Sequence, residues 1–206
     1  MSAFLGPIHH WLYNKIQIQE GLIQYLLVSL SDRAVAEQLE TEITDQFGRL
    51  PEGDLASVID ETNIHGWLQG QIAVVERRLA YVITEIKTQN RLTLNEICDL
   101  AFEYGRNKTS QTAETMEEAY QVLENNLLNG MPCDHVNQIM TTTVDSFIWE
   151  RTTEIHEQYW LEVNGDVSDY YAVRDALSEG ILNDAGYTIR HLEETKYELR
   201  RKTCTE

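Results

Sequence analysis

Two similar stretches of the chain each place one histidine and one glutamate among apolar residues. IHHWLYNKIQIQEGLIQYLL begins at residue 8, and IHGWLQGQIAVVERRLAYVI begins at residue 64. A neutral imidazole and a carboxylate together are ligands that suit iron, manganese or zinc. The candidate metal ligands in the two stretches are therefore His9, Glu20, His65 and Glu76.

The spacing of the apolar residues predicts that both stretches are helices. At about 100° per residue, the histidine and the glutamate of each stretch fall on the flank of the apolar stripe and should be partly or wholly buried. A buried carboxylate must find a partner or stay protonated. Within one helix the two side chains are about 16 Å apart, at ~1.5 Å per residue, so the partner of each must come from another element.

Two packing arrangements meet this requirement, and they pair the residues differently. If the two helices run antiparallel, His9 approaches Glu76 and His65 approaches Glu20. If they run parallel, the two histidines meet at one end and the two glutamates at the other. The sequence leaves both arrangements open.

A third long helix is expected in the stretch TVDSFIWERTTEIHEQYWLEV. On a helical wheel His156 falls inside the apolar stripe of this helix, whereas Glu157 falls outside it. The third helix therefore adds an inward histidine to the candidate ligands but no inward glutamate.

The five residues His9, Glu20, His65, Glu76 and His156 support two interpretations. They can bind a metal ion between helices, as carboxylate–histidine bundles do. They can instead be hydrogen-bonded core residues that fix the orientation of the helices. The Glu-x-x-His spacing of ferritin-like proteins is missing from the long helices, which argues against a di-iron centre. The tryptophans allow a third interpretation, a pocket for a flat cofactor such as haem.

The remaining patterns predict an all-α, internally duplicated bundle of about seven to nine helices. The repeated unit is a long helix, a medium helix and a short helix that starts at a proline. Its long and medium helices cover about 7–49 and 63–106, with a degraded third copy near 144–185. Helix starts are indicated at Pro7, Asp32 and Asn63, and Gly48 is suited to end the second helix. We expect a single domain over residues 1–206, in which 187–206 form either a hairpin or a frayed helical tail.

Charge and cysteine content limit the partners and the compartment. With 34 acidic and 16 basic residues, the formal net charge is −18. An anionic surface of this size repels phosphate backbones and anionic lipid headgroups, so we expect neither nucleic-acid nor membrane binding. A basic protein partner and a homo-oligomer stay open. The three cysteines form no Cys-x-x-Cys pair and no secretory signal is visible, which favours the cytoplasm.

The opening FLGPIHHWLYNKI and the stretch NGMPCD resemble those of a family of uncharacterised bacterial helical proteins, and the likeness extends over most of the chain. No activity is established for that family, so the resemblance implies nothing about function. The inward histidines and glutamates are similar to those of hemerythrin-like and ferritin-like bundles only at the level of the fold, because the ligand spacings differ.

The sequence thus predicts a cytoplasmic metal-binding bundle that holds iron, manganese or zinc through His9, Glu20, His65, Glu76 and His156. Whether such a protein is an enzyme, and which reaction it performs, does not follow from the sequence. The alternative is a non-enzymatic interaction or oligomerisation module in which the His–Glu pairs are structural.

Overall fold

The computed structural model describes residues 5–108 and 112–202 of the chain. The described residues form two compact units. The first holds the chain up to Ile97 together with His156–Tyr170, and the second holds Cys98–Ile155 together with the chain from Tyr171 onward. Each unit is discontinuous in sequence. The single domain that we expect from the sequence stays a prediction.

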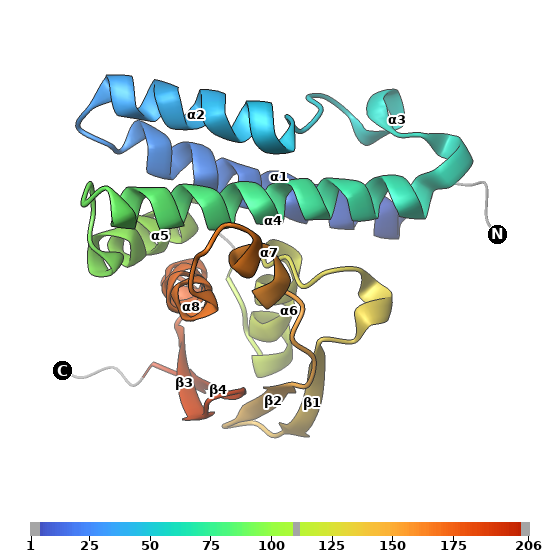
Figure 1. Ribbon diagram of the computed structural model, residues 1–206. Helices are drawn as coiled ribbons and strands as arrows, with labels where there is room; N and C mark the ends of the chain where they lie inside the picture. The colour runs from blue at the N-terminus through green and yellow to red at the C-terminus, as the bar shows by residue number, and fades with distance from the viewer. Residues whose placement is uncertain (1–4, 109–111, 203–206) are drawn as a thin grey trace. The chain divides into compact units, whose positions relative to one another are not determined.

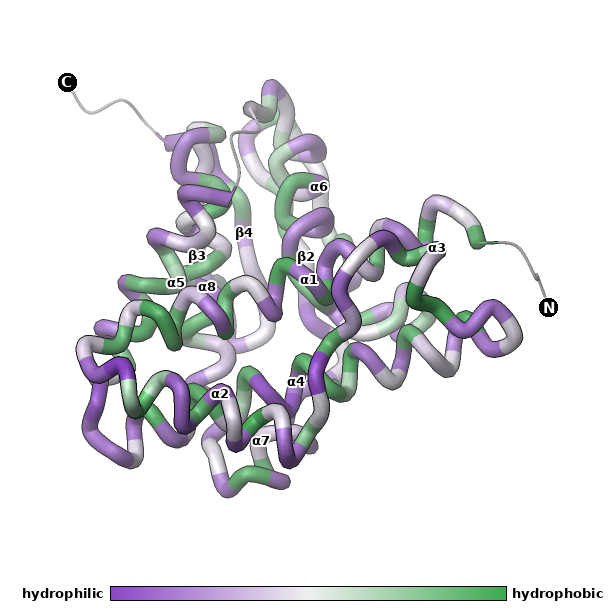
Figure 2. Tube along the Cα trace, turned by 90° about the horizontal axis from the view of Figure 1, so that it is seen from above, coloured by the Kyte–Doolittle hydropathy of each residue, from purple (hydrophilic) through white to green (hydrophobic). Residues whose placement is uncertain are grey.

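The first unit is built on three helices that contact one another pairwise: α1 (Pro7–Val28), α2 (Arg33–Phe47) and α4 (Ile64–Thr88) (Figure 1). The short α3 (Leu55–Val58) lies in the connection between α2 and α4, and α7 (Glu157–Glu162) packs on α4. Hydrophobic and hydrophilic residues alternate in short runs along α2 and α4 in Figure 2, as expected for amphipathic helices. The buried aliphatic side chains include Ile16, Ile23, Leu26, Ile43, Leu68, Ile72 and Ile83.

The predicted helix boundaries in this unit are confirmed. Pro7 is the first residue of α1, and the side chain of Asp32 accepts hydrogen bonds from the backbone N–H groups at the start of α2. Gly48 follows α2 with a φ of 85°, a backbone conformation that residues with a Cβ rarely adopt. Asn63 caps α4 by accepting a hydrogen bond from the backbone of Gly66. Local sequence signals, a proline for α1 and capping side chains for α2 and α4, therefore mark where these helices begin.

The second unit combines helices with an antiparallel sheet. Most of α5 (Leu94–Lys108) and α8 (Val167–Leu182) belongs to it, with all of α6 (Met116–Asn126). The strands are β1 (Asn137–Thr142), β2 (Phe147–Arg151), β3 (Tyr187–Glu193) and β4 (Lys196–Arg201). The sheet has the order β1-β2-β4-β3, so β1 and β3 are its edges.

Aromatic side chains on the central strands form the core of the second unit. Trp149 of β2 pairs with Tyr197 of β4, and their rings stack at a centroid distance of 5.3 Å. Tyr120 of α6 lies against Phe147, at 4.5 Å, and against Trp149, at 5.2 Å. Such ring pairs contribute beyond the burial of their area. The sheet is therefore an integral part of this unit.

The prediction of an all-α fold is wrong, because the described residues contain a four-stranded antiparallel sheet beside eight α-helices. The error lies in the stretch expected to be the third long helix. There Phe147 and Trp149 are buried in β2 and alternate with less buried neighbours, which is the period of a strand. The helix that follows, α7, has only six residues. The degraded third repeat therefore lacks the long helix that defined it.

The hairpin alternative for the end of the chain is confirmed. The strands β3 and β4 pair antiparallel, with Ile189 opposite Leu199 and His191 opposite Tyr197. Residues 203–206 lie outside the described part of the chain. Within that described part, no helix has the length and apolar content needed to cross a lipid bilayer.

Two glycines provide a matched test of the close packing between α5 and α8. A Cβ at Gly180 of α8 would overlap the backbone carbonyl oxygen of Phe102 in α5, whereas a Cβ at Gly70 in α4 would meet nothing. We expect Gly180→Ala to lower the free energy of unfolding by roughly 2 kcal/mol through overpacking. Gly70→Ala should raise it by about 0.5–1 kcal/mol through helix propensity. Urea denaturation measures both, and equal effects would contradict this packing.

Candidate functional site

The two similar helices α1 and α4 run parallel, side by side. Three contacts along their length establish this direction. The rings of His9 and His65 are 5.7 Å apart, Gln19 donates a hydrogen bond to Glu76, and Arg78 forms an ion pair with Glu20. Residue numbers rise together on both helices. Of the two arrangements that the sequence leaves open, the parallel one is therefore present.

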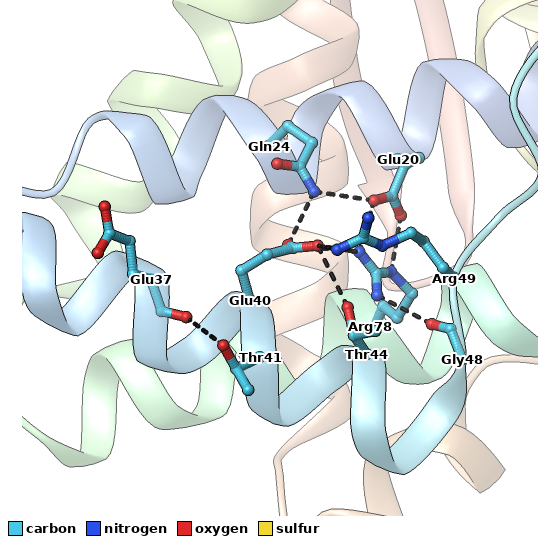
Figure 3. A network of polar contacts seen from close by, with 9 residues as sticks. All are labelled: Glu20, Gln24, Glu37, Glu40, Thr41, Thr44, Gly48, Arg49 and Arg78. Carbon is cyan, nitrogen blue, oxygen red and sulfur yellow. Dashed lines mark hydrogen bonds and ion pairs between the residues drawn. The ribbon is translucent and has the colours of Figure 1, made fainter.

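Glu20 is bound by a buried arginine, not by a histidine. The Arg78 guanidinium donates to both carboxylate oxygens of Glu20, from Nε at 2.9 Å and from Nη2 at 2.7 Å, and to the carbonyl oxygen of Gly48 at 3.0 Å (Figure 3). Such a two-point contact is the strong form of an ion pair. The side chain of Arg78 is 0 % exposed and that of Glu20 is 15 % exposed. Glu20 is therefore held in a fixed orientation.

A second carboxylate from α2 completes this cluster. Glu40 lies 3.4 Å from Nη2 of Arg78, and Gln24 of α1 donates to both Glu20, at 3.0 Å, and Glu40, at 2.9 Å. Burial by itself would lower the pKa of Arg78, but the hydrogen bonds and negative charges of Glu20 and then Glu40 raise it above the ordinary value. Arg78 therefore stays charged, with two carboxylates to balance it.

Glu76 lies in a different and wholly buried cluster. Its carboxylate accepts a hydrogen bond from Gln19 Nε2 at 3.0 Å and lies 3.0 Å from His156 Nδ1. The side chains of Glu76 and His156 are 1 % and 2 % exposed. The ring of His156 also stacks on Tyr170, at 4.0 Å between centroids. His156, which precedes α7, thus ties that segment to α4.

The two remaining histidines lie at the amino-terminal ends of α1 and α4, away from both glutamates. His9 Nδ1 accepts a hydrogen bond from the backbone N–H of Gly6 at 3.0 Å, and His65 is exposed. Partial burial lowers the pKa of His9, and the charges of His65 and then of His10 lower it further. His10 is exposed as well. These histidines repel one another when protonated and share no carboxylate.

The five predicted ligands therefore do not converge on one point. The structure brings His9 to His65 and Glu76 to His156, and it places Glu20 with Arg78. Within residues 5–108 and 112–202, no group of three or more His, Cys, Asp or Glu side chains has an arrangement that could hold a metal ion. The description of the chain as metal-binding is corrected accordingly. The physical reason is that each buried carboxylate already has protein donors around it.

The partners Arg78 and Gln19 were not predicted, although the repeat contains a signal for them. The offset that relates His9 to His65 also relates Leu22 to Arg78 and Gln19 to Val75. Leu22 and Val75 are core residues, 2 % and 0 % exposed. When a position holds a core aliphatic residue in one copy of the repeat and a polar residue in the other, the polar side chain is expected to be buried and to need a partner.

A groove between α1 and α2 lies beside the Arg78 cluster. Two cavities, of about 410 and 310 Å³, line up along it and share Gln24 and Glu40. The loop after α2 borders the groove and is anchored by Tyr13, which donates a hydrogen bond to the carbonyl of Pro51 at 2.8 Å. The charged residues that line the two cavities are Glu20, Arg33, Glu37, Glu40, Arg49 and Glu52.

Arg49 and Glu52 are the exposed charges of the larger cavity, and Arg33 and Glu37, which form an ion pair with each other, are those of the smaller one. The Arg49 guanidinium is 4.0 Å from Glu40, and its side chain is 65 % exposed. At that distance and exposure the pair contributes little to stability, and the guanidinium can be exchanged for another cation. The groove therefore offers carboxylates to a positively charged group.

Comparisons with known proteins identify no relative. No family model, no curated protein and no solved structure matches the chain. Function must therefore be argued from the geometry of the chain.

The Arg78 cluster yields a stability test that separates a structural role from a metal-binding one. We expect Arg78→Met to lower the free energy of unfolding by about 3 kcal/mol, because it leaves Glu20 and Glu40 close together with no cation between them. Thermal denaturation measures this loss. The midpoint of the wild type should not change when a chelator such as EDTA is added. A midpoint that falls with the chelator and recovers with stoichiometric zinc, iron or manganese would contradict the structural role.

The two histidines give a prediction for NMR titration. We expect the pKa of His9 to lie below 6.5 in the wild type and to rise in His65→Asn, which removes a neighbouring positive charge. His10→Asn should raise it less, because the charge of His10 has the smaller effect. Equal shifts in the two variants would show that the rings of His9 and His65 are not neighbours.

Proposed function

We propose that the chain is a non-enzymatic interaction module, and that the groove between α1 and α2 binds a basic side chain of a protein partner. The internal matching of the buried charges supports a structural role for the His–Glu and Arg–Glu contacts. Glu20 and Glu76 are both contacted by donor groups of the chain itself. The groups that remain for binding a partner are therefore the exposed charges.

The single observation that carries the proposal is the position of Arg49. This guanidinium belongs to the chain, lines the groove and lies at a loose 4.0 Å from Glu40. It indicates which kind of group the groove accepts, because a guanidinium or ammonium group from a partner would meet the same carboxylate. Glu52, exposed beside it, adds a second carboxylate for that cation.

The charge of the whole chain supports the same partner. A formal net charge of −18 attracts a basic protein over a distance and speeds the encounter at low ionic strength. The groove then provides the local contact. A cytoplasmic setting belongs to this proposal, on the basis of cysteines that form no Cys-x-x-Cys pair.

Charge variants of opposite sign test the proposal with an arginine-rich peptide as the probe. We expect Glu52→Gln to weaken binding about threefold, because one carboxylate is lost. Arg49→Gln should strengthen binding about threefold, because the competing cation is lost. One exposed charge changes a binding affinity by roughly this factor. Fluorescence anisotropy at low and at high salt measures the affinity.

Each variant has a matched control in the same unit. Glu61→Gln removes an exposed carboxylate outside the groove, and Arg91→Gln removes the cation of another loose pair, in which Arg91 lies 3.9 Å from Asp32. Both controls should change the affinity much less than their counterparts. If each control matched its counterpart, the binding would reflect net charge alone and the groove would not be the site.

A further inference from the structure

The two edges of the sheet in the second unit differ in charge. The edge strand β3 carries Arg190, His191 and Glu193, whereas residues 136–144, which include the whole of β1, read VNQIMTTTV and carry no charge. An open edge presents unpaired N–H and C=O groups to any other strand. Proteins commonly protect such an edge with charged side chains. Here β3 has that protection and β1 lacks it.

The charged side chains of β3 are also engaged with neighbours in the same unit. Arg190 forms an ion pair with Glu198 at 2.9 Å, His191 with Asp175 at 2.8 Å, and Glu193 with Lys196 at 2.8 Å. A strand that approached β3 would have to disturb these pairs. No such obstacle is present among the side chains of β1, which are exposed from Gln138 to Thr142.

Several apolar side chains are exposed on and next to β1. Ile139 is 54 % exposed, Met140 49 % and Val144 84 %. Isoleucine, threonine and valine favour strand pairing, and cross-strand pairs of such residues stabilise a sheet. Both edge strands contain a bulge, at Met140 in β1 and at Leu192 in β3, so the bulge does not distinguish the two edges. The absence of charge does.

We propose that β1 pairs antiparallel with the β1 strand of a second copy of the chain, which joins two four-stranded sheets into one. Self-pairing brings uncharged residues opposite uncharged residues, so this contact adds no local like-charge pair to the repulsion between two chains of net charge −18. A basic partner would gain no ion pair from residues 136–144. The contact is two-fold symmetric, so it closes at the dimer.

This inference is independent of the proposed function, because it uses only residues of the second unit, whereas the groove belongs to the first. Its failure would leave the peptide-binding prediction unchanged.

Lysine substitutions at the two bulges test the dimer. We expect light scattering coupled to size-exclusion chromatography to give the mass of two chains for the wild type, and of one chain for Met140→Lys. Leu192→Lys is the matched control, because Leu192 is an exposed apolar bulge residue on the other edge strand, 37 % exposed, and it should leave the dimer intact. Each lysine reduces the net negative charge, so dissociation cannot be attributed to a rise in the overall repulsion between the chains and must come from the edge itself.

Thr141→Lys provides a second disruption in case Met140→Lys does not fold, and circular dichroism verifies the fold of each variant. Thr141 is exposed, and its partner within the sheet is Ile148 of the neighbouring strand β2. A wild type with the mass of one chain over a wide range of concentration would overturn the proposal. So would folded Met140→Lys and Thr141→Lys proteins that stay dimeric, or a Leu192→Lys protein that dissociates as they do.

Discussion

The first unit depends on the requirement that a buried charge be matched. Arg78 is 0 % exposed and Glu76 is 1 % exposed, and each would be strongly destabilising without its partners. One partner of each comes from the neighbouring helix α1: Glu20 for Arg78 and Gln19 for Glu76. If α1 slid along α4, both contacts would break together. Two polar contacts, one residue apart on α1 and two residues apart on α4, therefore fix the register of two helices whose apolar side chains alone would tolerate small shifts.

Parallel packing of α1 and α4 explains the connection between them. A chain that leaves the end of α1 must return to the starting end before α4 can run alongside it. Helix α2 and the segment with α3 make that return, and α2 contacts both long helices (Figure 1). The return path brings Glu40 to Arg78 and places Gly48, whose carbonyl also accepts from Arg78, at the end of α2. The returning segment, which makes parallel packing of α1 and α4 possible, thus also provides hydrogen-bond acceptors for Arg78.

Much of the helical architecture of the first unit could be predicted from sequence, because its signals are local. Asp32, Asn63 and Pro7 mark helix starts within a few residues of the contacts that they make. The inward direction of His156 was also predicted correctly, although its helix was not. The partners of the polar residues could not be read from helical periodicity, because Arg78 and Gln19 meet Glu20 and Glu76 from another helix.

The sheet was missed for a related reason. The strand β2 pairs with β4, roughly fifty residues further along the chain, and the pairing of Trp149 with Tyr197 has no local signature. The stretch around Trp149 contains apolar residues that satisfy helical spacing as well as strand alternation. Periodicity alone does not decide between the two in a short apolar run. Pairing with the distant strand β4 determines that this stretch is a strand, and the residues of β4 are not part of the local pattern.

The divergence of the two repeated helices explains why one glutamate lies at the wall of a groove and the other lies in the core. In α4, arginine stands where α1 has Leu22, and in α1, glutamine stands where α4 has Val75. Each change supplied a partner for the glutamate of the opposite helix. Glu20 faces α2 and stays 15 % exposed beside an open groove, whereas Glu76 faces His156 and is enclosed. The same residue type thus lies at the wall of a groove in one copy and in the core of the other.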